Sequence, residues 1–210
     1  MFPALYAILD PELAPAPLTT LASTLADAGV RLMQLRDKRG SAAQIHSQAK
    51  ELQAILAPRG VRFIVNDRPD IAAMTDSGGV HVGQEDLPAE EARRICGISR
   101  WVGVSTHNLE QLREADLTSV DYIAVGPIFP TGTKQNPDPV VGIELLRAAR
   151  QMTAKPLVAI GGITIESAAA VFRAGADSVA IIRDLLAAPD PAERAREYLA
   201  IAERARSRPD

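Results

Sequence analysis

The sequence is poor in the features that mark several large classes of protein. It has one cysteine, Cys96, in 210 residues, which excludes an intrachain disulfide framework and fits a reducing compartment. Its net charge is −3 and aromatic residues make up 4% of it, so it has no general footprint for nucleic acid or an anionic membrane. No apolar run approaches the ~18 residues that a membrane span needs. Because the first residues also lack the basic region of a signal peptide, we expect a soluble, cytoplasmic, globular protein.

Two common functional motifs are missing as well. No Gly-x-Gly-x-x-Gly follows the first apolar run, so a dinucleotide-binding unit has no local support. No Gly-x-Ser-x-Gly elbow occurs, and Cys96 has no evident activating partner. Cys96 follows Ile95 in a predicted helix, and we interpret it as a small buried residue rather than a reactive thiol. The sequence therefore does not suggest a protein nucleophile.

Eight short apolar runs recur along the chain, each of strand length and rich in Val and Ile, as in strands buried on both faces. These runs are Ala4–Leu9, Arg31–Leu35, Arg62–Val65, Gly79–Val82, Trp101–Val104, Asp121–Val125, Pro156–Ile160 and Asp177–Ile182. Stretches with helical spacing lie between them, such as Leu18–Ala28 and Ala42–Leu56. Helix-capping residues punctuate the order, with Gly after helices and a polar N-cap before them; we assign Gly29, Gly175, Ser41, Asn108 and Thr164 to these places.

Alternating strands and helices predict a parallel sheet, either doubly wound and open or closed into a barrel. Eight units in 210 residues match the closed form, near the lower end of its usual size. We therefore predict an α/β fold, a (βα)8 TIM barrel formed as a single domain by residues 1–210.

Polar residues concentrate where the apolar runs end. In a TIM barrel these positions share one rim, where the chemistry takes place. The residues that follow or end the runs include Gln34, Arg36, Lys38, Asn66, Asp67, His81, Asp86, Ser105, Gly161, Gly162 and Arg183. The starts of the runs show fewer such residues, and this asymmetry predicts an enzyme.

The stretch from Asp121 to Lys134 changes abruptly from an apolar strand to a loop rich in hydrogen-bond donors. Gly126 and Gly132 allow a close backbone approach, while Thr131, Thr133 and Lys134 offer hydroxyl, N–H and ammonium groups. Such a loop suits phosphate or pyrophosphate. The alternative is an ordinary Pro/Gly loop.

The residue types at the rim suggest separate roles. Asp67 and Asp86 are hard oxygen ligands suited to Mg²⁺ together with a substrate phosphate. Alternatively, they cap the helices predicted to begin near Arg68 and Pro88. Lys38, Arg36 and Lys134 suit pyrophosphate, the first two with solvated loop charges as the alternative. Gly161-Gly162 before a helix suits a second phosphate. His81 is interpreted as a hydrogen-bonded structural residue, and His46 and His107 as surface or cap residues.

Six motifs in this order and spacing make the chain resemble the thiamine phosphate synthase family over nearly its whole length. They are Gln34–Lys38, Asn66-Asp67, His81–Pro88, Gly103–Ser105, Gly126–Lys134 and Ala159–Ile163. The resemblance implies a (βα)8 barrel that joins 4-amino-2-methyl-5-(diphosphooxymethyl)pyrimidine to a thiazole phosphate and releases pyrophosphate by an Mg²⁺-dependent dissociative displacement. It also implies small-molecule substrates and, since family members commonly self-associate, a homodimer as one option.

The resemblance also implies site residues. Those for the pyrimidine diphosphate are Gln34, Arg36, Lys38, Asn66, Ser105 and Lys134, with Ser105 and Lys134 taking a catalytic part. Those for the thiazole phosphate are Thr131, Thr133, Gly162, Ile182 and Arg183, and the metal ligands are Asp67 and Asp86. Arg183 departs from the small hydroxyl residue that many members carry there; it either binds the phosphate or pairs with Asp184.

Other functions remain open at this point. A thiazole tautomerase shares the barrel but works by proton transfer and should not need the full set of diphosphate and metal residues. Another phosphate-binding barrel, such as an epimerase or an indole-forming enzyme, would need an acid–base pair at the rim. A non-catalytic thiazole phosphate-binding barrel would bind phosphate without turnover. The arginine-rich stretch Ala192–Arg206 is interpreted as a last amphipathic helix that closes the barrel rather than a nucleic-acid contact.

Overall fold

The computed structural model describes residues 1–132 and 138–207 and shows eight parallel strands closed into a barrel. Each strand pairs with the next, and β8 pairs with β1 in the register Leu5 to Val179. The strands are β1 (Leu5–Leu9), β2 (Leu32–Leu35), β3 (Arg62–Asn66), β4 (Gly79–Val82), β5 (Trp101–Thr106), β6 (Tyr122–Val125), β7 (Leu157–Ile160) and β8 (Ser178–Ile181). The predicted TIM barrel is confirmed, with every strand at its predicted place.

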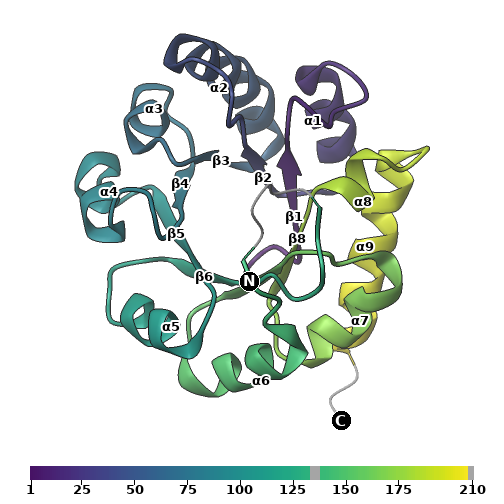
Figure 1. Cartoon of the computed structure of the whole chain (residues 1–210). Helices are drawn as coiled ribbons and strands as arrows, with labels where there is room; N and C mark the ends of the chain where they lie inside the picture. Colours follow the sequence, from purple (N-terminus) through teal and green to yellow (C-terminus); the bar gives the residue numbers. More distant parts are fainter. Residues whose placement is uncertain (133–137, 208–210) are drawn as a thin grey trace.

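Helices form a ring around the strands (Figure 1). They are α1 (Leu18–Asp27), α2 (Ala42–Leu56) with the 3-10 turn η1 (Ala57–Arg59), α3 (Pro69–Met74), α4 (Ala89–Cys96), α5 (Leu109–Asp116), α6 (Gly142–Met152), α7 (Ile165–Arg173), α8 (Arg183–Leu186) and α9 (Pro191–Arg206). The last helix packs against α7 and α1, beside the seam between the first and last strands (Figure 1). It therefore closes the ring, as predicted for the C-terminal stretch.

Local sequence signals explain where helices begin and end. Ser41 and Gln44 form a reciprocal capping box at the start of α2, and the Asn108 side chain accepts a hydrogen bond from the Gln111 N–H at the start of α5. Gly29 adopts a left-handed conformation (φ 103°) after α1, which costs glycine little. These predicted caps are confirmed.

The core has two layers, as expected for a barrel. The larger cluster packs the outward faces of the strands against the helices. The smaller fills the barrel interior, and its buried members are Tyr6, Ile8, Leu32, Ile64, Tyr122, Ala124, Val158 and Ala180. Because both faces of each strand are covered, the strands read as continuous apolar runs in the sequence.

Aromatic residues fill the barrel end at which the strands begin. Phe2 stacks on Trp101 with ring centroids 5.1 Å apart, and the chain's first residues lie over this opening (Figure 1). The Arg62 guanidinium lies 4.1 Å from the centroid of the same Trp101 ring, a cation–π arrangement. This packing leaves the opposite end, at which the strands finish, as the place for a site.

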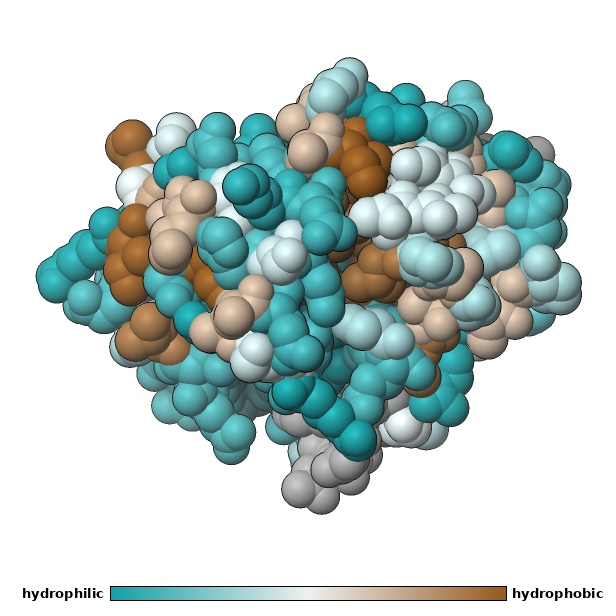
Figure 2. Space-filling model, turned by 90° about the horizontal axis from the view of Figure 1, so that it is seen from above, coloured by the Kyte–Doolittle hydropathy of each residue, from teal (hydrophilic) through white to brown (hydrophobic). Residues whose placement is uncertain are grey.

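Figure 2 shows one face of the molecule, on which hydrophilic residues predominate and hydrophobic ones occur in small, separate groups. Among the helices of the described residues, none combines the length and the apolar character required to cross a membrane.

Candidate functional site

The predicted site residues that the structure describes lie at the end of the barrel where the strands finish. Gln34 lies in β2, Asn66 is the last residue of β3, and Ser105 lies near the end of β5. Asp67 and Ile182 each follow directly after a strand, β3 and β8 respectively. Closure of the sheet brings these positions to one rim, so the predicted convergence is confirmed, whereas their roles are a separate question.

Two carboxylates and one ammonium group meet beside β3. The Lys38 ammonium pairs with Asp67 Oδ2, and Asp67 also interacts with Asp86. Burial and, to a lesser extent, the neighbouring Asp86 raise the pKa of Asp67 to about 6, against the opposing effect of the Lys38 ammonium. Asp67 has a left-handed backbone (φ 59°), which is uncommon for a residue with a side chain and is found at functional sites. These three side chains form a small acidic cluster with one compensating cation.

The alternative reading of the two aspartates as helix caps is wrong. The N-cap of α3 is Arg68 and that of α4 is Pro88, and neither helix has a side-chain cap hydrogen bond in the described part of the chain. Asp86 Oδ2 instead accepts a hydrogen bond from Gly83 N–H at 2.8 Å, which folds the loop after β4 back on itself. Both carboxylates are thus held at the rim.

The charge of Arg36 is neutralised by Asp10, an acid that was not among the predicted site residues. Its Nη1 lies 2.7 Å from Asp10 Oδ2, and the Asp10 side chain is only 6% exposed. Asp10 follows β1, so it occupies the same rim as the predicted residues. The solvated-charge alternative is therefore wrong for Arg36. Lys38 pairs with Asp67 but keeps 48% of its side chain exposed, so for this residue the alternative stays open.

A chain of hydrogen bonds crosses the barrel interior between two predicted substrate residues. Gln34 Nε2 donates to Tyr6 Oη at 2.7 Å, and Tyr6 Oη lies 3.0 Å from Tyr122 Oη. Tyr122 Oη lies 3.0 Å from His81 Nδ1, and His81 Nε2 lies 2.8 Å from Ser105 Oγ. His81 is a hydrogen-bonded structural residue, as predicted, whereas the two tyrosines were hidden in apolar runs.

Burial determines the ionisation state of the side chains in this hydrogen-bond series. It lowers the pKa of His81 to about 4 and raises the pKa of both tyrosines above its usual range. All three side chains are therefore neutral at pH 7. Hydrogen bonds between neutral groups are stronger in the low dielectric of a protein interior than in water, so these side chains hold one another in place.

The region after β7 and β8 contains the predicted second phosphate seat. Gly162 has φ 62°, and a Cβ there would lie 2.4 Å from the Pro130 carbonyl oxygen, so only glycine fits beside the β6 loop. Ile182 precedes the short helix α8, and Arg183 Nη2 donates to the Gly132 carbonyl oxygen at 3.2 Å. Gly162 and Arg183 thus both lie against the loop that follows β6.

The alternative pairing of Arg183 with Asp184 is wrong. Asp184 Oδ2 accepts hydrogen bonds from Tyr198 Oη at 2.7 Å and from Arg194 Nη1 at 3.1 Å, both on α9. The aspartate therefore fastens α8 to α9 and leaves the Arg183 guanidinium beside Gly132.

The loop after β6 is fixed at its beginning by β7. Ile128 N–H donates to the Ile160 carbonyl oxygen at 2.9 Å and Phe129 N–H to that of Gly161 at 3.0 Å. His107, predicted as a surface or cap residue, lies half-buried with Nδ1 2.6 Å from the Gly126 carbonyl oxygen. Thr131 lies within the described loop, whereas Thr133 and Lys134 lie outside the described residues. The predicted cradle is therefore described only in part.

Comparison with known proteins agrees with the rim geometry. The family model described as thiamine monophosphate synthase matches residues 5–185 of the chain. The chain belongs to the thiamine monophosphate synthase family. It is 54% identical over 204 residues to the thiamine-phosphate synthase of Koribacter versatilis, covering 95% of each chain. It is 40% identical over 195 residues to that of Methanospirillum hungatei, covering 92% of this chain and 95% of the relative.

A solved structure shows the same likeness. The thiamine phosphate pyrophosphorylase of Pyrococcus furiosus is 30% identical and superimposes with a TM-score of 0.87, covering 96% of each chain. The family resemblance inferred from the motifs is thus confirmed, and with it the enzyme class, a transferase of thiamine biosynthesis.

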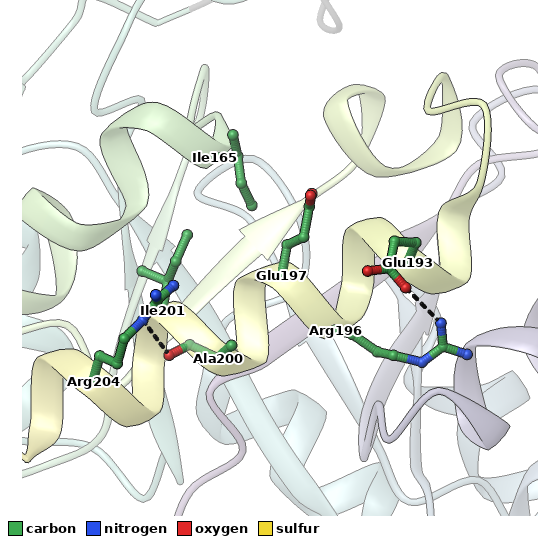
Figure 3. A pocket seen from close by; sticks show the side chains of 7 residues that line it. All are labelled: Ile165, Glu193, Arg196, Glu197, Ala200, Ile201 and Arg204. Atoms are coloured by element: carbon green, nitrogen blue, oxygen red, sulfur yellow. Dashed lines mark hydrogen bonds and ion pairs between the residues drawn. The ribbon is translucent and has the colours of Figure 1, made fainter.

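A hollow on the outer surface of this family member is separate from the rim. It is lined by α9 and by Ile165 of α7, with the α9 side chains arranged along one helical face (Figure 3). Glu193 pairs with Arg196 at 2.8 Å, and Arg204 Nε donates to the Ala200 carbonyl oxygen at 3.2 Å. The hollow contains none of the predicted site residues.

The described part of the rim has no preformed metal cage built of many protein ligands. Within residues 1–132 and 138–207, no three or more His, Cys, Asp or Glu side chains are grouped so that they could hold a metal ion. Asp67 and Asp86 are a pair, which is the number that Mg²⁺ commonly takes from a protein when a substrate phosphate supplies other ligands.

Proposed function

We propose that this chain joins 4-amino-2-methyl-5-(diphosphooxymethyl)pyrimidine to a thiazole phosphate, giving thiamine phosphate and pyrophosphate. The observation that carries the proposal is the contact of Asp67 with both Asp86 and Lys38 at the end of β3. Such a site can neutralise a diphosphate through a cation and a metal ion at once. Membership of the thiamine monophosphate synthase family supports the same reaction.

The pyrimidine diphosphate would lie over β2 to β5, with the loop after β6 at its side. Its proposed ligands are Gln34, Arg36, Lys38, Asn66, Ser105 and Lys134. Lys38 and Arg36 are each held by one carboxylate before substrate arrives, so the diphosphate would exchange one anionic partner for another. The cost of fixing two long side chains is thereby met in the folded enzyme.

Asp67 and Asp86 would hold Mg²⁺, which when bound supplies positive charge to the leaving pyrophosphate. The residues fit this ion because they are hard oxygen donors. Burial and the proximity of Asp86 raise the pKa of Asp67, and a bound divalent cation would favour its ionised form. Lys38 would then be free to move from Asp67 to the diphosphate.

The thiazole phosphate would lie across β7, β8 and the loop after β6. Its proposed ligands are Thr131, Thr133, Gly162, Ile182 and Arg183. Gly162 begins the turn into α7 and offers a bare backbone N–H, while Arg183 offers a guanidinium fork. The two substrates would then face one another across the rim.

The rim's chemistry suits a dissociative displacement. In such a reaction, charge builds up on the departing pyrophosphate before the thiazole nitrogen attacks the pyrimidine methylene. The chain's groups would hold the two substrates, exclude water and stabilise that charge through Lys38, Lys134 and the Ser105 hydroxyl. No step requires a nucleophile from the protein. The single thiol, Cys96, is buried and suits the reducing cytoplasm, where we place this activity.

The test is pyrophosphate release from purified protein given both substrates, with Mg²⁺ and with EDTA. We expect thiamine phosphate only with the metal, and we expect Asp67→Asn and Asp86→Asn to reduce its formation to a trace. Asp70→Asn is the matched control, because Asp70 is an acid on α3 that pairs with Arg68. Product formed equally well in EDTA would contradict the proposal. Binding of thiazole phosphate without turnover would favour a tautomerase or a non-catalytic binding protein instead.

A further inference from the structure

We propose that the buried chain from Gln34 to Ser105 has one hydrogen-bond direction, which turns the Ser105 hydroxyl hydrogen toward the diphosphate. Tyr6, Tyr122 and His81 would thus be positioning residues, because they act on the substrate only through Ser105 and Gln34. The proposal rests on the proposed function for the roles of these two end residues. Its hydrogen-bond direction can be tested without any turnover.

The direction follows from counting donors along the chain. Gln34 Nε2 donates to Tyr6 Oη, so the Tyr6 hydrogen must be given to another acceptor. Its other hydrogen-bond partner in the described structure is Tyr122 Oη, which therefore accepts from Tyr6. Tyr122 in turn gives its hydrogen to His81 Nδ1. Nδ1 is then a lone pair, the ring hydrogen lies on Nε2, and Nε2–H donates to Ser105 Oγ.

The opposite direction leaves a buried hydrogen without an acceptor. If His81 Nδ1–H donated to Tyr122 and Tyr122 to Tyr6, the Tyr6 oxygen would accept from both Tyr122 and Gln34. The Tyr6 hydrogen would then have no acceptor among the described residues, at 1% exposure. An unmade hydrogen bond of this kind is costly. Only turning the Gln34 amide over would restore an acceptor.

Packing holds the Tyr122 ring, the middle member of the hydrogen-bond series, in place. Tyr122 stacks on His81 at 5.5 Å between ring centroids and meets Tyr6 edge-on at 6.0 Å. The neighbouring strand makes room for it, since a Cβ on Gly103 would lie 2.0 Å from Tyr122 Cζ. A tyrosine fixed on three sides cannot rotate away from its partners, so the hydrogen-bond order is set by the fold.

The proposed direction has a consequence at the rim. Ser105 Oγ accepts from His81, so its own hydrogen is free to be donated outward. A hydroxyl that donates to a phosphoryl oxygen stabilises the charge that develops on departing pyrophosphate. In the opposite direction, Ser105 would donate to His81 and present only lone pairs to an anion. The buried chain would thus decide whether Ser105 attracts or repels the diphosphate.

The first test is the protonation pattern of His81 by ¹⁵N NMR on the full chain without substrates. The chain has three histidines, so the His81→Gln spectrum assigns the signal by its disappearance. We expect a neutral ring with the hydrogen on Nε2. A hydrogen on Nδ1 would overturn the proposal whatever the enzyme's activity, because it would reverse the direction of the hydrogen bonds from Gln34 to Ser105. Failure of turnover with the Nε2–H form present would instead count against the proposed function.

The second test is kinetic and compares two replacements of His81. Gln reaches the position of the ring Nε2 and can still donate to Ser105, whereas the shorter Asn reaches only toward Tyr122. We expect Ser105→Ala and His81→Asn each to lower kcat/KM for the pyrimidine diphosphate by about tenfold or more, the worth of one hydrogen bond to a charged group, and His81→Gln to lose less. Equal losses in the two His81 variants would contradict a donating role.

A double-mutant comparison separates positioning from general damage to the core. Tyr122→Phe should lower kcat/KM by roughly tenfold in the native background and by about twofold or less when Ser105 is already alanine. Thr75→Val is the control, because it removes another buried hydroxyl that bonds the Ile71 carbonyl on α3. We expect its stability loss without a change in kcat/KM. Independent, additive losses from Tyr122→Phe and Ser105→Ala would refute the relay.

Discussion

The pKa of Asp67 leads to a quantitative prediction about metal use below neutral pH. Burial and the neighbouring Asp86 raise that pKa to about 6, against the partial relief that Lys38 provides. A carboxyl with a raised pKa is ionised above it and protonated below it. Asp67 is therefore mostly a charged ligand for Mg²⁺ at pH 7 and mostly a protonated one at pH 5, and a metal ion binds the deprotonated carboxylate.

The size of the effect follows from that pKa. With a midpoint near 6, about nine-tenths of Asp67 is ionised at pH 7 and about one-tenth at pH 5. The apparent affinity for the metal should then fall roughly tenfold between these two values. The ionised fraction of Asp67, and with it the apparent metal affinity, should change most steeply near pH 6. A carboxyl with an ordinary pKa would stay ionised over the whole interval and would produce almost no change.

The assay is the Mg²⁺ concentration for half-maximal pyrophosphate release, measured at saturating substrates between pH 5 and pH 7.5. Titration of the substrate's own phosphates is common to all variants, so Asp67→Asn is the reference for the protein's share. Asn also tolerates the left-handed backbone at this position, whereas alanine would add strain. The residual activity of Asp67→Asn, however small, should show a flatter pH dependence. Identical profiles for the two proteins would refute the assignment of the titrating ligand to Asp67.

Four substitutions test other parts of the rim and fold. Arg36→Ala should destabilise the protein by about 3 kcal/mol or more in urea unfolding, because it leaves buried Asp10 without its cation. The double variant with Asp10→Asn should recover part of this loss, and unchanged stability of Arg36→Ala would show that the Arg36–Asp10 pair does not stabilise the fold. Arg183→Ala should raise the KM for thiazole phosphate several-fold without altering that for the pyrimidine diphosphate, and an unchanged value would remove Arg183 from the phosphate site. Gly103→Ala should displace the Tyr122 ring, costing roughly 1 to 3 kcal/mol in thermal unfolding and lowering turnover, whereas a native-like enzyme would show that the ring has room to move. Ser41→Ala should cost about 1 kcal/mol in the same unfolding assay through loss of the capping box while leaving activity intact.

The fold was predictable because a closed barrel imposes the same local rule eight times. Each strand has both faces covered, so Val158 inside and Leu157 outside make equally apolar signals. Strand ends shifted by a residue or two, as at Ser105, which extends β5 beyond the predicted Val104. Polar residues at the rim can take part in the backbone pairing of strands just as apolar residues do. Residue type alone therefore does not show where a strand ends.

The partners of the rim charges were less predictable. The sequence indicates that Arg36 and Lys38 follow β2, but their carboxylate partners come from β1 and β3 and depend on how the barrel closes. Asp184 follows Arg183 directly, yet it bonds to α9 because a helical turn points neighbouring side chains in different directions. Sequence adjacency suggested a pair that the three-dimensional arrangement does not form.

The buried tyrosines show what the apolar runs concealed. Alternate residues of each strand point into the barrel, so Tyr122 and Ala124 face inward while Ile123 and Val125 face the helices. A buried tyrosine hydroxyl usually has a hydrogen-bond partner, and for a tyrosine that points into a barrel a side chain on another strand can supply it. A run containing one tyrosine is ambiguous alone. Inward tyrosines on β1 and β6 together with an inward histidine on β4 can satisfy one another, and their shared hydrogen bonds reach Gln34 and Ser105 at the rim.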